Sequence, residues 1–373
     1  MTVLYHLFVP FAEDHIIFNI FRYQTFRAAG AVVTAFVVAF WFGPEIISRL
    51  RMLKVGQVVR TEGPQTHLGK SGTPTMGGVI IVLATVIPTL LWARLDNWNT
   101  VTAIVVLCGL GFLGFMDDYL KIARKKTEGL KGRYKLVGQA SIGLILGLAL
   151  VFVGFNDIPT YPFAWTQIPF FKSVHVEMWW PLYVLFVTFM VVGCSNAVNL
   201  TDGLDGLAAG LSAIAAVTFG VFAYLLGRVD AANYLNLFYV PGAGELTIFC
   251  VALAGGCMGF LWFNAHPAEV FMGDTGSLAI GGVLGAISVL LRAEFLLAIV
   301  GFVFVAEALS VMLQTVYFKY TKRKLGTGRR IFRMAPLHHH FEQIGWHESK
   351  VIIRFWIMGI MCALVAFATL KIR

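Results

Sequence analysis

Five aspartates stand in short polar motifs that separate long apolar segments of the chain. Asp117 and Asp118 open DDYLK, Asp202 and Asp205 lie in TDGLDG, and Asp274 lies in FMGDTGS. Adjacent carboxylates repel each other unless a cation compensates them. Mg²⁺ takes oxygen ligands and commonly bridges a few carboxylates to substrate phosphates. These residue types therefore predict a divalent metal site.

Taken one at a time, the same carboxylates have simpler interpretations. Asp117 and Asp118 fit a solvated helix end, and Asp274 fits a helix N-cap. Ordinary capping does not need five carboxylates at one membrane face, however, and Lys121 and Lys135 in the same regions can neutralise phosphate oxygens. The combination predicts a site for a diphosphate complexed with Mg²⁺.

The composition sets the environment in which such a site must be held. Of the 373 residues, 58% are hydrophobic and 13% are charged, against about 25% charged in an ordinary soluble domain. These values exclude a disordered chain and a disulfide scaffold, and they argue against a nucleic-acid binder, whose basic residues would lie on a polar surface. We expect one polytopic helical membrane domain over residues 1–373.

Long uncharged segments mark the expected membrane spans. About 20 helical residues cross the hydrocarbon layer, and the segments of suitable length number about ten. They are Ala28–Pro44, Ser71–Ala93, Asn97–Met116, Leu136–Asn156, Met178–Thr201, Gly206–Gly227, Leu246–Ala268, Thr275–Leu291, Phe295–Phe318 and Phe355–Leu370. The fold class predicted is therefore an all-α integral membrane protein of about ten transmembrane helices.

The basic residues predict the orientation of these spans. Twenty of the 29 Lys and Arg residues lie in Ser48–Met76, Asp117–Lys135 and Lys319–Lys350, which are on the same side of the predicted spans as the aspartate motifs. Because cytoplasmic loops carry an excess of Lys and Arg, these connections are expected in the cytoplasm. Both termini are then periplasmic, and the site lies at the cytoplasmic face.

Two further features are ambiguous from the residues alone. The triplet His338–His340 cannot bind one ion from a regular helix, since consecutive residues point about 100° apart; phosphate binding or proton handling is favoured over a zinc site. Glu307 is the one acid deep inside a predicted span, with Ser310 and Gln314 on its face. It is either a functional residue or a partner in an interhelical hydrogen bond.

The ordered motifs KSGTPTMGG, DDYLK, NAVNLTDGLDG, FMGDTGS and APLHHHFE resemble those of the polyprenyl-phosphate N-acetylhexosamine-1-phosphate transferases. The triple histidine favours the muramoyl-pentapeptide branch of that family. The resemblance implies transfer of phospho-MurNAc-pentapeptide from UDP-MurNAc-pentapeptide to undecaprenyl phosphate, giving lipid I and UMP, with Mg²⁺ required. It also implies a homodimer in the bacterial cytoplasmic membrane.

The resemblance also implies roles for individual residues. It assigns catalysis to Asp117, Asp118, Asp274 and His338, with the three aspartates as metal ligands and Asp117 as the candidate base. Substrate-binding positions are Lys70, Lys121, Lys135, Asn199, Asp202, Asp205, Asn264, Phe271, Gln314, His339 and His340, of which Phe271 matches an aromatic residue that stacks on uracil.

Two alternatives concern the reaction and the class of protein. The favoured reaction is a direct displacement by the lipid phosphate, and the competing one passes through a covalent aspartyl-phosphate on Asp117 or Asp118. The rival class is a transporter for a charged solute, which ten spans and Glu307 would also fit. The acids cluster at one surface instead of the midplane, which favours the enzyme.

Overall fold

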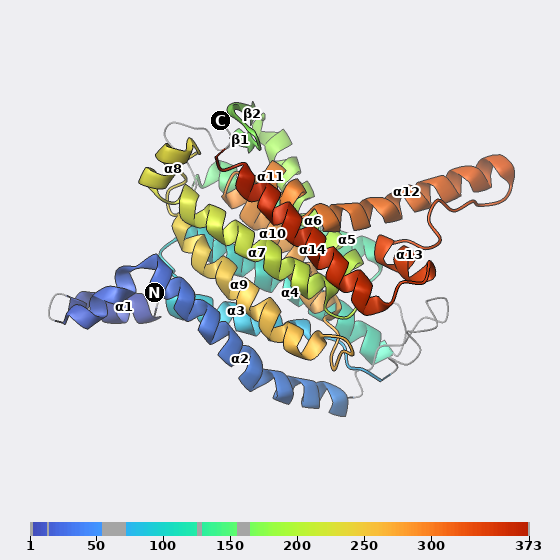
Figure 1. The fold of residues 1–373 in the computed structure, drawn as a ribbon, viewed down its shortest axis with the longest axis horizontal. Coiled ribbons are helices and arrows are strands. Elements are labelled where there is room, and N and C mark those ends of the chain that lie inside the picture. Colours follow the sequence, from blue (N-terminus) through green and yellow to red (C-terminus); the bar gives the residue numbers. More distant parts are fainter. Residues whose placement is uncertain (1–2, 13–14, 54–71, 125–128, 155–164, 372–373) are drawn as a thin grey trace.

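The computed structural model describes residues 3–12, 15–53, 72–124, 129–154 and 165–371. The chain is a bundle of long helices with one small hairpin (Figure 1). Within the described ranges, nine helices are long and apolar enough to cross a membrane. The protein is therefore a multi-pass helical membrane protein.

The helices and strands of the described residues divide into two halves along the chain. The first half comprises α1 (Val3–Phe8), η1 (Val9–Ala12), η2 (Ile16–Arg22), α2 (Gln24–Met52), α3 (Gly78–Trp92), α4 (Trp98–Arg124), α5 (Gly132–Phe152), β1 (Trp165–Ile168), β2 (Phe171–Glu177) and α6 (Trp180–Thr201). The second half comprises α7 (Leu207–Leu226), α8 (Val229–Leu235), α9 (Ala243–Asn264), α10 (Gly273–Leu290), α11 (Glu294–Val300), α12 (Phe302–Leu325), α13 (Leu337–Gln343) and α14 (Glu348–Ala368).

Three details differ from the pattern of spans predicted from the sequence. The second expected span appears as α3, which has 15 residues and is shorter than the other nine candidates. The predicted span Phe295–Phe318 is wrong as a single helix, because the chain breaks at Gly301 between α11 and α12. The loop before α6 forms an antiparallel hairpin of β1 and β2, a small exception to an all-α fold.

Helix α10 is the centre of the bundle. Every residue from Thr275 to Leu290 is buried, and the helix packs against α3, α4, α6 and α7. A helix that is apolar on all sides suits this position, because none of its faces has to meet water. Asp274 lies in the first turn of this helix, so the most enclosed element of the fold carries a predicted site residue.

Two glycines allow neighbouring helices to approach the start of α10 at backbone distance. A Cβ added at Gly78 of α3 would overlap the backbone of Gly276, and one added at Gly114 of α4 would overlap the backbone oxygen of Asp274. Small residues at helix interfaces permit this close approach in membranes. The packing of α3 and α4 thus fixes where the first turn of α10 lies.

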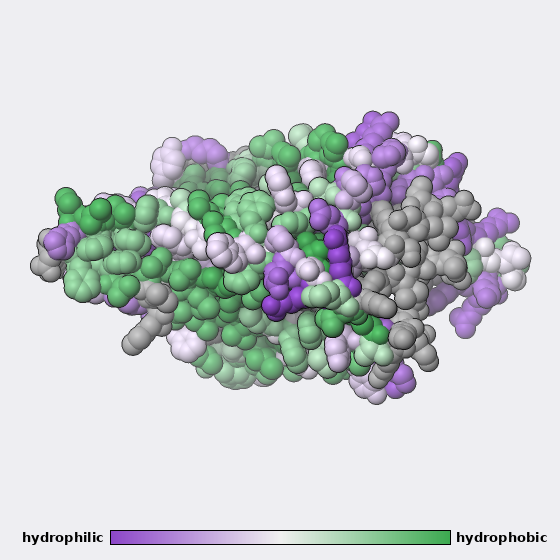
Figure 2. Space-filling view, turned by 90° about the horizontal axis from the view of Figure 1, so that it is seen from below, coloured by the Kyte–Doolittle hydropathy of each residue, from purple (hydrophilic) through white to green (hydrophobic). Residues whose placement is uncertain are grey.

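The outer surface has a large apolar part and a smaller hydrophilic part. In Figure 1, α1 and the last turns of α14 lie on the opposite side of the molecule from α13, and α12 projects away from the bundle. Figure 2 shows an extensive apolar surface, with hydrophilic residues gathered mostly toward the end at which α12 and α13 lie. Helix α13, which carries the three predicted histidines, lies at that end (Figure 1).

Candidate functional site

An acidic cluster forms where α4 ends and α10 begins. Asp117 and Asp118 lie near the end of α4, and Asp274 lies in the first turn of α10. One carboxylate oxygen from each of the three lies within 4.8 Å of the others. The side chains of Asp117 and Asp118 are almost wholly buried, and Asp274 is largely buried. The structure therefore brings together the three aspartates that the sequence predicts as metal ligands.

The ammonium group of Lys121 lies in the middle of this cluster. Its Nζ is 2.7 Å from Oδ2 of Asp117, 2.7 Å from Oδ2 of Asp274 and 3.4 Å from Oδ1 of Asp118. Lys135, near the start of α5, donates to Oδ2 of Asp274 at 2.9 Å. Two cations thus offset much of the negative charge of the three carboxylates.

Backbone groups hold two of these carboxylates in place. Oδ2 of Asp118 accepts hydrogen bonds from the backbone N–H and the hydroxyl of Thr275, at 2.9 and 2.8 Å. Oδ1 of Asp117 accepts the backbone N–H of Leu130 at 2.7 Å. Asp118 therefore joins α4 to the first turn of α10, whereas Asp117 joins α4 to the segment before α5.

Helix α6 and the turn after it complete the cluster. Asn199 donates from Nδ2 to Oδ1 of Asp274 at 2.5 Å and to the hydroxyl of Ser277 at 2.8 Å. Asp202 follows the end of α6, and its pKa is raised well above the usual value, chiefly because the group is enclosed by protein and then because Asp274 and Asp118 are near. Its surroundings therefore favour the neutral acid or a nearby cation.

Asp205, although it belongs to the same turn, has different partners. Its Oδ2 lies 3.2 Å from Nδ1 of His266 and accepts the backbone N–H of Ala268 at 3.1 Å. The carboxylate of Glu348, at the start of α14, accepts the backbone N–H of Asp205 at 3.1 Å and lies 3.5 Å from the same His266 nitrogen. This second group fastens the loop between α9 and α10 to the turn and to α14.

Two predicted substrate residues lie on that loop. Asn264 ends α9 and is buried; its Oδ1 accepts the N–H of Gly206 and its Nδ2 donates to the carbonyl of Val270. The backbone of Phe271 is bonded to Pro74 and Gly77, and its side chain is half-buried. The side chain of Asn264 thus stabilises the loop through two hydrogen bonds, while the ring of Phe271 is partly exposed.

The side chain of Gln314 is also hydrogen-bonded within the protein. It lies on α12, where its Oε1 accepts the backbone N–H groups of Ile331 and Phe332 and its Nε2 donates to the carbonyl of Phe332. This geometry makes it an anchor for the segment between α12 and α13. Lys70, a further predicted substrate residue, lies outside the described residues.

The three histidines of α13 have three separate environments. His338 is completely buried beside Glu307 of α12. His339 pairs with Glu342, 2.8 Å from Nδ1 to Oε2, and His340 accepts the backbone N–H of Arg333 through Nδ1. They do not converge on one point, in agreement with the helical spacing that argues against a shared metal.

Sequence reasoning missed the roles of two acids at this end of the bundle. Glu348 carries no motif signal, because its importance comes only from its contact with the turn at Asp205. Glu307 was visible as an acid inside an apolar helix, but its partner His338 is 31 positions away. An intramembrane acid alone indicates that a partner exists without identifying it.

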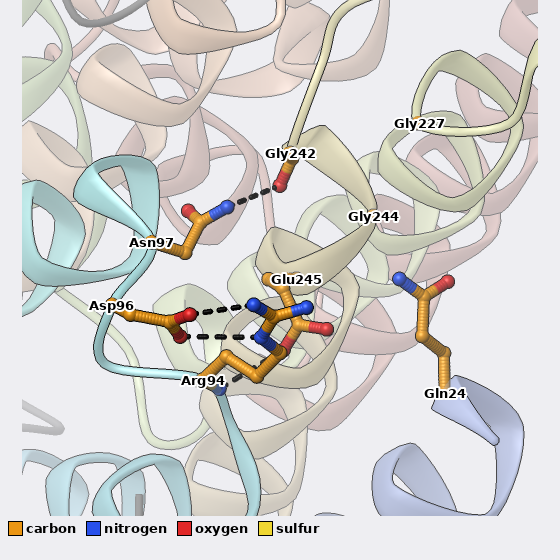
Figure 3. Close-up of a pocket in the computed structure, with 8 residues that line it drawn as sticks. All are labelled: Gln24, Arg94, Asp96, Asn97, Gly227, Gly242, Gly244 and Glu245. Carbon is orange, nitrogen blue, oxygen red and sulfur yellow. Dashed lines mark hydrogen bonds and ion pairs between the residues drawn. The ribbon is translucent and has the colours of Figure 1, made fainter. Parts of the chain in front are cut away.

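A second polar region lies elsewhere and has a different character. Figure 3 shows a cavity of about 270 Å³ between the start of α2, the loop after α3 and the start of α9. Arg94 and Asp96 form an ion pair there, and the carboxylate of Glu245 is held by the buried Arg27 and by the backbone N–H of Arg94. Each acid that lines this cavity is thus paired with an arginine. These acids do not form a cluster like the one around Lys121.

Comparisons with known proteins agree with the motifs. Residues 100–292 match the model of glycosyl transferase family 4, and residues 70–82 match signature 1 of phospho-N-acetylmuramoyl-pentapeptide-transferases. Proteins named phospho-N-acetylmuramoyl-pentapeptide-transferase from Gemmatimonas aurantiaca, Desulfotalea psychrophila and Geobacter sp. (strain M21) are 56%, 52% and 50% identical to this chain. Each alignment covers 100% of both chains.

Proposed function

This chain belongs to the phospho-N-acetylmuramoyl-pentapeptide-transferases of glycosyl transferase family 4, and from that premise we propose how its acidic cluster works. It is a membrane transferase of peptidoglycan synthesis. The reaction is the transfer of phospho-MurNAc-pentapeptide from UDP-MurNAc-pentapeptide to undecaprenyl phosphate, giving lipid I and UMP. The observation that carries the proposal is the gathering of three carboxylates around one ammonium group at a helix end.

The cluster has the chemistry that a magnesium ion needs. Asp117, Asp118 and Asp274 supply only oxygen donors, which are the ligands that Mg²⁺ prefers. The ammonium of Lys121 already lies where a cation is attracted by all three carboxylates, at 2.7 to 3.4 Å. These residues would therefore hold Mg²⁺. When bound, the ion neutralises negative charge on the diphosphate of the donor substrate.

The placement of the cluster suits one lipid and one nucleotide substrate. It lies at the ends of apolar helices, where a polyprenyl phosphate in the membrane and a water-soluble nucleotide can meet. The basic connections at this end support a cytoplasmic location under the positive-inside rule, with both termini periplasmic. The expected setting is the bacterial cytoplasmic membrane, and family membership supports a homodimer.

Each residue of the cluster has a distinct task in this reaction. Lys121 and Lys135 bind oxygens of the diphosphate, because both ammonium groups already lie at the acidic cluster and are partly exposed. Asp117 accepts the proton of the lipid phosphate at Oδ2, the oxygen whose partner is the Lys121 side chain. Oδ2 of Asp118 is bonded twice to Thr275 and so holds α10 in position, while its Oδ1 lies on the side of Lys121 and would be the oxygen that contacts the metal.

The bond changes follow a direct displacement. An oxygen of the lipid phosphate forms a bond to the phosphorus that carries the sugar, and the bond from that phosphorus to the bridging oxygen breaks. UMP leaves with the bridging oxygen and its electron pair. Positioning and charge neutralisation supply most of the rate in such reactions. Isolation of enzyme labelled with ³²P after incubation with a suitably labelled donor would instead establish the covalent aspartyl-phosphate route.

Asp274→Asn tests the proposal. This change removes one charge from the cluster while keeping the shape of the side chain, and we expect UMP release from UDP-MurNAc-pentapeptide to fall by about 100-fold or more. The assay is run with and without undecaprenyl phosphate and Mg²⁺, because a carrier of the nucleotide would not release UMP only when the lipid is present.

Asp230→Asn is the matched control. It is the same substitution at an exposed aspartate that pairs with Arg228 outside the cluster, and it should leave the rate unchanged. Near-normal activity of Asp274→Asn, with the control also active, would refute the assignment of the metal and the diphosphate to this cluster.

A further inference from the structure

Glu307 directs both of its carboxylate oxygens at one histidine. Oε1 accepts the backbone N–H of His338 at 3.1 Å, and Oε2 lies 3.2 Å from Nδ1 of the same residue. Both side chains are 0% exposed. Because a charge buried in this way is costly unless it is paired, the location of Glu307 inside α12 depends on this single partner among the residues that the structure describes.

The other side of the imidazole faces the turn that follows α6. A Cβ added at Gly203 would overlap Nε2 of His338 and would lie 2.9 Å from its Cε1, so the ring occupies the space where a side chain would be. Nε2 is buried and has no hydrogen-bond partner in the described part of the chain, and the contact between Nδ1 and Oε2 of Glu307, at 3.2 Å, is an ion-pair contact and not a hydrogen bond. The ring is therefore held by the carboxylate on one side and by its packing against Gly203 on the other.

Gly203 connects this ring to the acidic cluster. Its neighbour Asp202 lies close enough to Asp274 and Asp118 for their charges to raise its pKa, and Asn199, four residues before Gly203, is bonded directly to Asp274. The imidazole is therefore packed against the residue that directly follows Asp202, just after the end of the helix that carries Asn199.

We propose that Glu307 is a positioning residue for the transfer reaction: its carboxylate fixes the imidazole of His338 against the turn at Gly203, and so holds that turn beside the acidic cluster. The proposal rests on the proposed function, because His338 is the group through which Glu307 acts. Removal of a carboxylate that orients a functional histidine commonly lowers activity by about 10- to 100-fold.

A double-mutant cycle tests this role. Glu307→Gln keeps the size of the side chain and one acceptor oxygen but removes the charge, and we expect kcat to fall by about 10- to 100-fold with KM for both substrates within about twofold. In a His338→Ala background, the same change should lower kcat by less than about twofold, since the group through which it acts is gone. Glu307→Asp, which retains a carboxylate, should recover part of the rate.

The control is Ser310→Ala on the same face of α12. Ser310 is buried, and its hydroxyl bonds only to the backbone carbonyl of Glu307, so kcat should be unchanged. Thermal unfolding of each variant separates misfolding from loss of rate, and Glu307→Asp replaces Glu307→Gln in the cycle if the latter does not fold.

Two results would overturn the inference. If the losses from Glu307→Gln and His338→Ala multiply in the double variant, Glu307 acts independently of the histidine, while the proposed function stands. If His338→Ala is fully active, the inference fails together with the role of His338 in the proposed function.

Discussion

Gly114 of α4 offers a direct test of how closely the acidic cluster must be held. A Cβ at this position would overlap the backbone oxygen of Asp274 and would lie 2.5 Å from its carbonyl carbon, whereas ordinary contact begins at 3.4 Å. Because the obstructing atoms are backbone, no rotamer change relieves the overlap. In Gly114→Ala, α4 and α10 must therefore separate by at least about 0.9 Å, the difference between those two distances, since the carbonyl oxygen is closer still.

A separation of this size would lengthen the hydrogen bonds and the ion pair that hold the acidic cluster in place. Thr275 and Asp118 are joined across the two helices by bonds of 2.9 and 2.8 Å, and Lys121 lies 2.7 Å from Asp274. Adding about 0.9 Å takes them beyond hydrogen-bond range. Since a misplacement of about 1 Å can reduce a rate by about 100-fold, we expect a loss of that order in UMP release.

Gly111→Ala is the matched control. It is the same change less than one turn earlier on α4, where the nearest atom to an added Cβ is a side-chain carbon of Val82 at 3.4 Å, so activity should be retained. Both variants are assayed at saturating substrates after their thermal unfolding has been compared. If Gly114→Ala is as active as Gly111→Ala, close backbone packing does not set the geometry of the site.

Two further predictions concern stability. Glu245→Gln leaves the buried Arg27 without its charged partner, so we expect a loss of about 3–5 kcal/mol, measured as a lower thermal unfolding midpoint; an unchanged midpoint would contradict this. Burial raises the pKa of Glu294 from 4.5 to about 7, so the folded state retains a proton that the unfolded chain loses, and stability should fall by about 3 kcal/mol as pH rises from 4.5 to 7. Glu294→Gln should reduce this slope in midpoints measured across that range, and an identical slope would refute the assignment.

The membrane class and the members of the acidic cluster could be predicted from the sequence because both are local patterns. Asp117 and Asp118 are neighbours at the end of one apolar segment, and Asp274 begins another. The approach of Lys121 to Asp117 and Asp118 follows from its position one turn after them. Its contact with Asp274 does not, because that contact needs α4 and α10 to pack together.

The partners of the remaining polar residues could not be predicted, because they depend on how distant segments pack. Gln314 has its side chain bonded to the backbone of Ile331 and Phe332, which no motif indicates. Glu307 and His338 were both noticed individually, but their pairing requires α13 to fold back against α12. The break at Gly301 was missed because glycine in an apolar segment is compatible with a continuous helix as well as with an interruption.

The position of the Lys121 ammonium has a consequence for how α4 and α10 pack. Asp117, Asp118 and Asp274 would repel one another strongly if no cation were near. Lys121 and Lys135 lie within ion-pair distance of these carboxylates, so the protein supplies its own counter-charge. The packing of α4 against α10 therefore comes with its own compensating cations, one from α4 and one from α5.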